Sequence, residues 1–350
     1  MDKIKKIQQK MSNLDYIFLI NTNIKDPNML YCTSINLEYS FLVIPKNKSP
    51  LFFVSPLEYQ RAKRDCKIKQ VKIYKNPLKE IHEIIGDNKT IGINSEYVSI
   101  STYKKLRKHL KCNFKPVEKI FSDIRVKKTK EEIRHIKKAA SITDKIFKKL
   151  CKKLKENRTK FKTEKDLSNY IELLAKQYNT ELSFETIVAS GKNAALPHYF
   201  PKKTKICKGF CVIDFGIKYK NYVSDMTRTI FFGVPAKKDI INYEKVKSSN
   251  ANAIKKLNVG IKCRNIDKIS RKYIDYPHGV GHGIGIEVHE NPKLNIKSKD
   301  IIQENMCFTI EPGLYVPNKF GIRIEDDICM TKKGPEVLTK SSKNLICFHL

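Results

Sequence analysis

Long apolar segments are absent from this 350-residue sequence. Its strongest apolar runs, Tyr16–Ile20 and Leu51–Val54, are far shorter than the roughly 18 residues that a membrane-spanning helix requires. The N-terminal segment, MDKIKKIQQK, is charged and lacks the apolar core of a signal peptide. These absences argue against an integral membrane protein, and they predict a cytoplasmic protein that does not associate with membranes.

The sequence also lacks any C-x-x-C pair, although it contains ten cysteines. The closest two, Cys207 and Cys211, are too far apart for a zinc ribbon or a dithiol redox motif. Most of the cysteines lie beside apolar residues, as Cys211 does in Phe210–Ile213. We therefore expect most of them to be reduced and buried as small hydrophobic side chains.

Acidic residues are scarce relative to basic ones, with 36 Asp and Glu against 69 Lys and Arg, so the formal net charge is +33. Such a charge raises the question of nucleic-acid binding. The lysines, however, are spread over the whole chain and form no basic tail. Compositional bias is therefore the favoured explanation, and specific nucleic-acid binding is not expected.

The length predicts two domains, and the composition, 41% hydrophobic and 30% charged, is typical of a globular protein. Residues 1–122 alternate short apolar runs with helical stretches, which predicts a small α/β domain. The expected strands are Tyr16–Ile20, Phe41–Ile44, Leu51–Val54, Val71–Tyr74 and Ile91–Ile93, and the expected helices lie near Leu57–Asp65, Leu78–Ile85 and Ser101–Leu110.

Residues 123–350 are predicted to form a second domain of α+β type. After an expected linker at Phe121–Lys128, Thr129 and Glu132 have the spacing of a capping box, which marks a helix start. A second helix is expected from Thr163, followed by strands and turns. The order of two helices and then strands repeats from residue 240 onward, which indicates two structurally related halves.

Two aspartates lie within strand-like runs on either side of a short connection. A tight turn between Tyr219 and Lys220 would set Asp214 and Asp225 directly opposite one another, with Cβ atoms about 4.5–5.5 Å apart. Two buried carboxylates at that distance repel, which raises one pKa. A divalent cation between them would remove the conflict.

A second hairpin places another pair of acids opposite one another. A turn centred on Asn318 would oppose Glu311 and Glu325, and the surrounding residues are rich in turn formers. Arg323 lies two residues before Glu325 and therefore on the same strand face. We expect Arg323 to orient a ligand carboxylate.

Three histidines, His278, His282 and His289, fall within the glycine-rich run Pro277–Glu290, where the glycines favour close approach of the backbone to a site. His198 is a fourth candidate. Four carboxylates and one imidazole suit a pair of divalent metal ions. Such a pair can deprotonate a water for hydrolysis of an amide.

The motifs VIDFG, SDMTRT, HGVGHGIGIEVHE, TIEPGLY and GIRIEDD, in this order, resemble the metallopeptidase family of methionine aminopeptidases, aminopeptidase P and prolidase. The resemblance implies a "pita-bread" catalytic domain over roughly residues 125–350, with two pseudo-symmetric halves. The preceding α/β segment resembles the N-terminal domain of the prolidase, aminopeptidase P and creatinase branch. The implied cofactors are two divalent ions (manganese, cobalt, iron or zinc), with the ligands Asp214, Asp225, His282, Glu311 and Glu325.

The resemblance also implies roles for residues around the metal ions. Glu311 would serve as acid and base, His289 would donate to the substrate carbonyl, and His198 would hold the substrate. His278, Arg323 and Tyr315 would surround the centre, His278 and Arg323 as supports. Lys293 stands where some prolidases have an arginine that binds the dipeptide carboxylate; it keeps the charge without the bidentate fork.

The implied activity is that of an Xaa-Pro dipeptidase acting on small peptides, in a homodimer. An aminopeptidase P that accepts longer Xaa-Pro peptides is the nearest alternative. A methionine aminopeptidase is disfavoured, because that activity leaves the N-terminal domain unexplained. A nucleic-acid or ribosome-binding relative that uses the basic surface is the alternative from another class.

Overall fold

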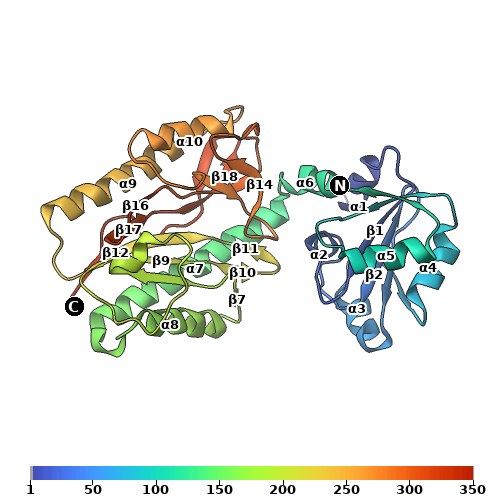
Figure 1. Cartoon of the computed structure of the whole chain (residues 1–350), viewed down its shortest axis with the longest axis horizontal. Helices are drawn as coiled ribbons and strands as arrows, with labels where there is room; N and C mark the ends of the chain where they lie inside the picture. The colour runs from blue at the N-terminus through green and yellow to red at the C-terminus, as the bar shows by residue number, and fades with distance from the viewer. Residues whose placement is uncertain (1–2, 350) are drawn as a thin grey trace. The chain divides into compact units, whose positions relative to one another are not determined.

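The computed structural model describes residues 3–349 of the chain, which divides into two compact units between Arg125 and Val126 (Figure 1). Among the described residues, no helix is both long and apolar enough to cross a membrane. The first unit ends with helix α6 (Glu118–Arg125), whose Phe121 and Ile124 are buried. The linker expected at Phe121–Lys128 was therefore wrong, because these two apolar side chains give the segment a core-facing side.

The first unit is built on a six-stranded sheet in the order β4-β3-β2-β1-β5-β6. Strand β2 is antiparallel to β1 and β3, whereas the pairs β3–β4, β1–β5 and β5–β6 are parallel. The strands are β1 (Tyr16–Asn21), β2 (Ser40–Pro45), β3 (Leu51–Val54), β4 (Gln70–Ile73), β5 (Thr90–Ile93) and β6 (Asn113–Pro116). The helices are α1 (Lys3–Gln9), α2 (Pro27–Thr33), α3 (Tyr59–Asp65), α4 (Pro77–Ile85) and α5 (Ile100–His109).

All the strands and helices expected in this unit are present, but three elements were missed. Helix α2 begins at Asp26, whose side chain accepts a hydrogen bond from the Asn28 amide, and Pro27 occupies the first helical turn. This Asp-Pro signal was available in the sequence. Strand β6 carries mostly exposed side chains, so its pairing with β5 left little apolar pattern to detect.

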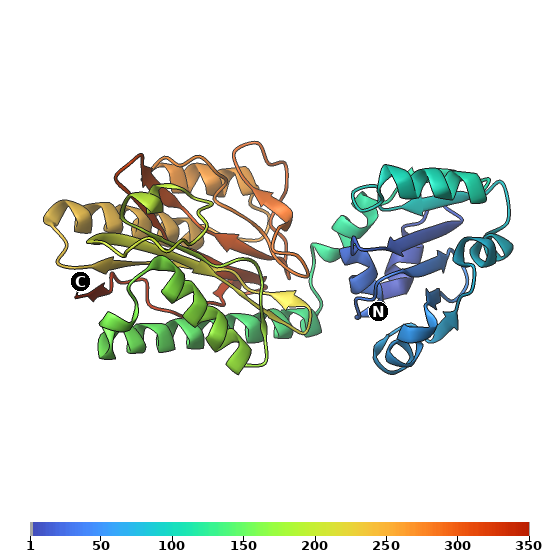
Figure 2. The ribbon, with the colours of Figure 1, turned by 60° about the horizontal axis from the view of Figure 1, so that its bottom comes forward.

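The second unit contains two halves, each with two helices and a sheet. In the first half, α7 (Lys130–Glu156) and α8 (Glu164–Gln177) pack on the sheet β20-β12-β9-β8. In the second half, α9 (Lys237–Lys255) and α10 (Cys263–Arg271) pack on strands of the sheet β14-β13-β15-β18-β19. Both views show the strands between the two helix pairs (Figures 1 and 2). This arrangement confirms the expected two-halved domain.

The remaining elements of this unit are short. The strands are β7 (Glu181–Leu182), β8 (Ile187–Ser190), β9 (Gly209–Phe215), β10 (Ile217–Tyr219), β11 (Tyr222–Val223), β12 (Met226–Phe232), β13 (Gly281–Gly283), β14 (Glu290–Leu294), β15 (Cys307–Ile310), β16 (Gly313–Val316), β17 (Phe320–Arg323), β18 (Asp326–Thr331), β19 (Gly334–Val337) and β20 (Cys347–Phe348). Short 3₁₀ helices occur at Pro56–Glu58 in the first unit, and at Arg158–Lys160 and Gly191–Ala195 in the second.

The helix starts of the second unit follow their predicted caps. The Thr129 hydroxyl accepts from the Glu132 amide at 3.3 Å, and the Glu132 carboxylate accepts from the Thr129 amide at 2.7 Å. Thr163 and Asp166 form the same arrangement at α8. All ten cysteines are free and most are buried, as expected.

The first hairpin has a register different from the predicted one. Asp214 pairs with Thr227 rather than with Asp225, because the turn has Lys220 and Asn221 at its tip, with φ of 46° and 70°. A two-residue turn with both φ values positive matches the twist of the flanking strands, and asparagine tolerates it. Asp225 therefore lies in the break between β11 and β12.

The second hairpin has the predicted register. Strands β16 and β17 pair from Gly313 with Arg323 to Val316 with Phe320, and Asn318 at the tip has φ 58°. Strands β15 and β18 continue the same register on the far side of a gap. Glu311 and Glu325 lie in that gap, so they occupy opposing positions as expected.

Candidate active site

The candidate metal ligands lie at strand ends and strand breaks, with one exception. Asp214 is near the end of β9, Asp225 precedes β12, and Glu311 and Glu325 flank the second hairpin. His282 is the exception, in the middle of β13. A Cβ atom on the neighbouring Gly281 would stand 2.0 Å from the Thr309 carbonyl oxygen, so glycine is needed for β13 to approach β15.

Three of these side chains form a cluster with the geometry of a cation site. Asp225, His282 and Glu325 each offer one ligand atom, and these atoms all lie within 4.8 Å of one another. His282 Nε2 is also 3.3 Å from Glu311 Oε1 and 3.8 Å from Asp225 Oδ2. The structure therefore brings together Asp225, His282, Glu311 and Glu325.

The carboxylates of the cluster repel one another in a buried setting. Burial raises the pKa of Asp225 well above its usual value, and the charges of Glu325 and Asp214 raise it further. Burial and the charge of Glu311 likewise raise the pKa of Glu325. Burial also raises the pKa of Asp214, although Arg323 opposes the change. Divalent cations relieve such a conflict.

Two oxygens in the cluster have the character of free ligand atoms. Oδ1 of Asp214 and Oδ1 of Asp225 are buried and accept no hydrogen bond from residues 3–349. Buried carboxylate oxygens are normally paired, because an unpaired one costs free energy. Oxygen donors with one imidazole suit divalent cations, so the residues present fit the metal ions that the sequence implies.

Glu311 and His282 form a buried ion pair beside this cluster. Burial alone would raise the pKa of Glu311, but the hydrogen bond and charge of His282 outweigh burial and lower it to about 2. Burial alone would lower the pKa of His282, and Glu311 raises it instead. The His282 backbone amide donates to Thr309 Oγ1 at 3.1 Å, which fixes β13 against β15.

Arg323 contacts Asp214 rather than Glu325, its neighbour along the strand. Its Nη2 donates to Asp214 Oδ2 at 2.6 Å, and its Nη1 donates to the Tyr315 hydroxyl at 2.9 Å. The Tyr315 hydroxyl lies 3.0 Å from His278 Nε2. A continuous chain of hydrogen bonds therefore runs from His278 through Tyr315 and Arg323 to Asp214, and it holds that carboxylate in one orientation.

His198 and His289 are exposed, whereas His278 and His282 are partly buried. The His289 ring centroid is 4.3 Å from that of His282. Burial lowers the pKa of His289, and the charges of His282 and His198 affect it too, so these rings share one region. His198 and His289 are thus the histidines that a bound peptide can reach.

Lys293 lies beside the cluster in the adjoining strand. It is the direct cross-strand partner of His282 in the β13–β14 ladder, and its side chain is exposed. Residues directly opposite in a ladder project to the same face of a sheet. The ammonium group is therefore on the same face of the sheet as the His282 ring.

Three supporting residues were missed by sequence reasoning. Thr227 Oγ1 donates to Glu325 Oε2 at 2.6 Å, Thr309 Oγ1 donates to Glu311 Oε1 at 3.4 Å, and the Asp225 amide donates to Asp327 Oδ2 at 3.0 Å. Thr227 lies two residues after Asp225, and Thr309 two before Glu311, so each shares a strand face with a candidate ligand. That spacing was the available signal.

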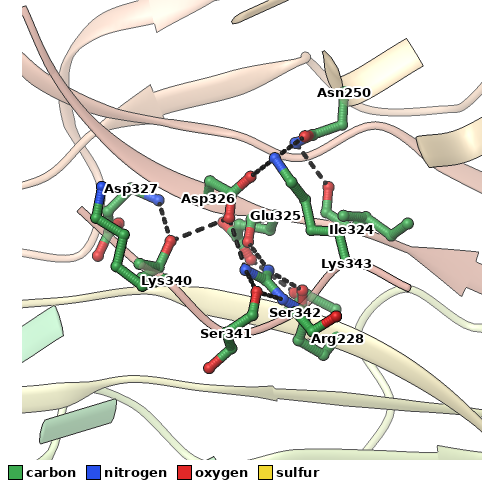
Figure 3. A network of polar contacts seen from close by, with 12 residues as sticks. Arg228, Asn250, Ile324, Glu325, Asp326, Asp327, Lys340, Ser341, Ser342 and Lys343 are labelled. Carbon is green, nitrogen blue, oxygen red and sulfur yellow. Dashed lines mark hydrogen bonds and ion pairs between the residues drawn. The ribbon is translucent and has the colours of Figure 1, made fainter. Parts of the chain in front are cut away.

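A buried ion-pair network lies next to Glu325 (Figure 3). Asp326 accepts from Arg228 Nη2 and from Lys343 Nζ, each at 2.7 Å. Arg228 also donates to the carbonyl oxygens of Glu325 and Ser341. The network fixes the backbone of Glu325 and ties the C-terminal segment to β18.

Comparison with known proteins places both units in one family. The model of metallopeptidase family M24 matches residues 134–332, and the creatinase/prolidase N-terminal domain matches residues 3–127. An Xaa-Pro dipeptidase of Pyrococcus furiosus is 34% identical over 358 residues, 99% of each chain. The structure of an Xaa-Pro dipeptidase from Bacillus anthracis matches with a TM-score of 0.91 at 29% identity, over 99% of both chains. An X-Pro aminopeptidase from Thermotoga maritima matches with a TM-score of 0.89 at 28% identity, over 99% of this chain and 100% of that one.

Proposed function

Since the chain belongs to metallopeptidase family M24 and carries a creatinase/prolidase N-terminal domain, we propose that it hydrolyses the peptide bond of Xaa-Pro dipeptides. Family membership and the metallopeptidase class were both expected from the sequence motifs. The substrate is inferred from a cluster of buried acids and His282 beneath two exposed histidines, together with full-length similarity to an Xaa-Pro dipeptidase.

The ligand set proposed from the sequence suits two divalent ions. Asp214, Asp225, His282, Glu311 and Glu325 would hold them, and manganese, cobalt, iron and zinc are all compatible with these donors. When bound, the ions supply a deprotonated water at neutral pH and polarise the scissile carbonyl.

The protein residues provide proton transfer and orientation. Glu311 is held as a carboxylate by His282, so it can accept a proton from water and pass it to the departing nitrogen. His289 would donate a hydrogen bond to the carbonyl oxygen as negative charge develops there. His198 would hold the substrate, while Tyr315, His278 and Arg323 keep Asp214 in place.

Proline after the scissile bond is recognised by shape and by the absence of a hydrogen. Its nitrogen has no hydrogen to donate, and its ring fixes the backbone, so a shaped pocket can select it. Lys293, on the same strand face as His282, would attract the carboxylate of a dipeptide as a point charge.

An aminopeptidase that accepts longer Xaa-Pro peptides is the second candidate. The similarity to an X-Pro aminopeptidase structure, which covers both chains almost fully, favours it. The two candidates differ at the far end of the substrate, where a lysine discriminates less sharply than an arginine.

One assay tests both candidates. Chelator-treated protein is supplied with each of the four metal ions and given Ala-Pro, Met-Pro and a longer Xaa-Pro peptide. Cleavage of the dipeptides supports the proposal, and preferential cleavage of the longer peptide supports the aminopeptidase. Failure to cleave any of them with every metal would contradict both.

The assembly and location of the protein are further proposals. We expect a cytoplasmic homodimer, because the N-terminal unit is large and contributes no candidate catalytic residue. Size-exclusion chromatography with light scattering tests the assembly. A fully active monomer at micromolar concentration would contradict it.

A further inference from the structure

Glu164 is a fully buried acid, with 0% of its surface exposed, in the first turn of α8. It is neither a candidate metal ligand nor part of the ion-pair network around Asp326. Acidic side chains are seldom buried completely unless their oxygens are satisfied by nearby donors.

Both carboxylate oxygens of Glu164 receive hydrogen bonds from the segment that follows β8. Oε1 accepts from the Ser190 amide at 2.7 Å, from Ser190 Oγ at 3.0 Å and from Asn193 Nδ2 at 3.1 Å. Oε2 accepts from the Tyr199 hydroxyl at 2.7 Å, and Asn193 Nδ2 also donates to that hydroxyl at 2.9 Å. One carboxylate therefore fixes both ends of the segment 190–199.

That segment carries His198, directly before Tyr199. The side chains of Leu196 and Phe200, on either side of it, are 56% and 62% exposed, so they provide little packing to hold the segment in place. The segment also reaches the candidate active site, because the Pro197 carbonyl accepts from Arg323 Nη1 at 3.3 Å. A Cβ atom on Gly321 would stand 1.7 Å from the Ala194 carbonyl oxygen, so the segment lies directly against β17.

We propose that Glu164 is a positioning residue that sets the place of His198, and hence the productive binding of substrate. The inference rests on the proposed peptidase function and adds a residue to it. Replacing the carboxylate with an amide puts an NH₂ group where an oxygen now accepts, so at least one buried donor loses its partner. The segment would then become free to move away from the substrate.

The absence of tryptophan from the sequence provides a test that does not depend on activity. Phe200→Trp places a single fluorescent reporter on the segment. We expect Glu164→Gln to lower the anisotropy of this reporter and to increase its quenching by acrylamide. The matched control is Glu172→Gln, on the same helix, whose carboxylate is 48% exposed in an ion pair with Lys176. Equal reporter signals in the two variants would overturn the proposal.

Kinetics in two backgrounds test whether Glu164 acts through His198. In the otherwise native protein, Glu164→Gln should lower kcat/KM for an Xaa-Pro dipeptide by about ten- to a hundredfold, the scale of a slightly misplaced substrate contact. In a His198→Ala background the same change should have almost no further effect. An equal loss in both backgrounds would overturn the proposal, whereas inactivity of the native protein would contradict only the proposed function.

Tyr199→Phe is the second variant, in case Glu164→Gln does not fold. It removes only the hydrogen bond to Oε2, so we expect a smaller change of the same sign in both the reporter and kcat/KM. A purely structural role would lower the melting temperature while the reporter and the kinetics of the folded enzyme stay unchanged, and this result would also overturn the proposal.

Discussion

The hydroxyl of Thr227 donates a 2.6 Å hydrogen bond to Oε2 of Glu325, a residue of the other half of the catalytic unit. The same hydroxyl accepts from Arg323 Nε at 3.0 Å. Thr227 thereby connects a candidate ligand to the arginine that orients Asp214. Its place opposite Asp214 in the β9–β12 ladder makes both contacts possible.

Thr227→Val should weaken metal binding by roughly 10- to 100-fold, the range for residues that orient a metal ligand. Valine keeps the shape but removes both hydrogen bonds. Thr227→Ser is the matched control, because it keeps the hydroxyl. Titration calorimetry with Mn²⁺ measures the affinity, and equal affinities in the two variants would show that the hydroxyl has no part in orienting Glu325.

Removal of divalent metal should abolish peptidase activity. Asp225→Asn and Glu325→Gln should weaken binding of at least one ion, because each removes a charge from the candidate cluster. Asp275→Asn, whose side chain is 93% exposed, is a control that should bind metal normally. Full activity in protein shown to be free of metal would refute the metal-dependent mechanism.

The metal-free protein should lose stability as the pH rises. The pKa values of Asp225 and Glu325 are raised above those of the unfolded chain, so the folded state favours their neutral forms. Their contribution is present below the unfolded pKa and is lost as the pH rises through the folded pKa. Melting temperatures across this pH range should fall less steeply for Asp225→Asn, and an unchanged slope would contradict the expectation.

Lys293→Ala should raise KM for Xaa-Pro dipeptides and leave longer peptides nearly unaffected. Lys293→Arg should sharpen the preference for dipeptides, chiefly through a lower KM, because the contact exists in ground and transition states alike. Lys297→Ala, at another exposed lysine nearby, is the control. If both changes at Lys293 leave the ratio of dipeptide to tripeptide cleavage unaltered, the lysine is only a solvated surface residue.

Asp326→Asn should destabilise the fold by roughly 3–5 kcal/mol at neutral pH, because it leaves buried Arg228 and Lys343 without their carboxylate. Burial alone would raise the pKa of Asp326, but these two cations outweigh it and lower the pKa. The contribution is therefore present above the unfolded pKa, about 4, and is lost as the pH falls through the folded pKa. Urea unfolding should show the difference between native and variant shrinking in acid; a constant difference would contradict the ion-pair explanation.

The sequence predicted features that depend on local patterns. The caps at Thr129 and Thr163 and the turn at Asn318 are set by neighbouring residues, and all three are present. The hairpin after Asp214 was misjudged, because the turn residue Lys220 is not a typical residue for a positive φ. A shift of the tip by one residue was enough to replace Asp225 with Thr227 as the partner of Asp214.

Contacts between distant segments could not be predicted in the same way. Arg323 lies on the strand of Glu325 but binds Asp214, because its long side chain reaches across to β9. Asp327 accepts from the Asp225 amide only because β18 passes beside the start of β12. These pairings depend on how the two halves pack, which no local pattern encodes.

The division of the candidate ligands between the halves has a mechanical consequence. Asp214 and Asp225 come from the first half, whereas His282, Glu311 and Glu325 come from the second. Bound metal would therefore act as a clasp between two pieces of chain. Protein cut at the connection near Val234, which is 77% exposed, should stay associated more strongly with metal than without it. The same clasp would let fragments expressed apart find one another when metal is added.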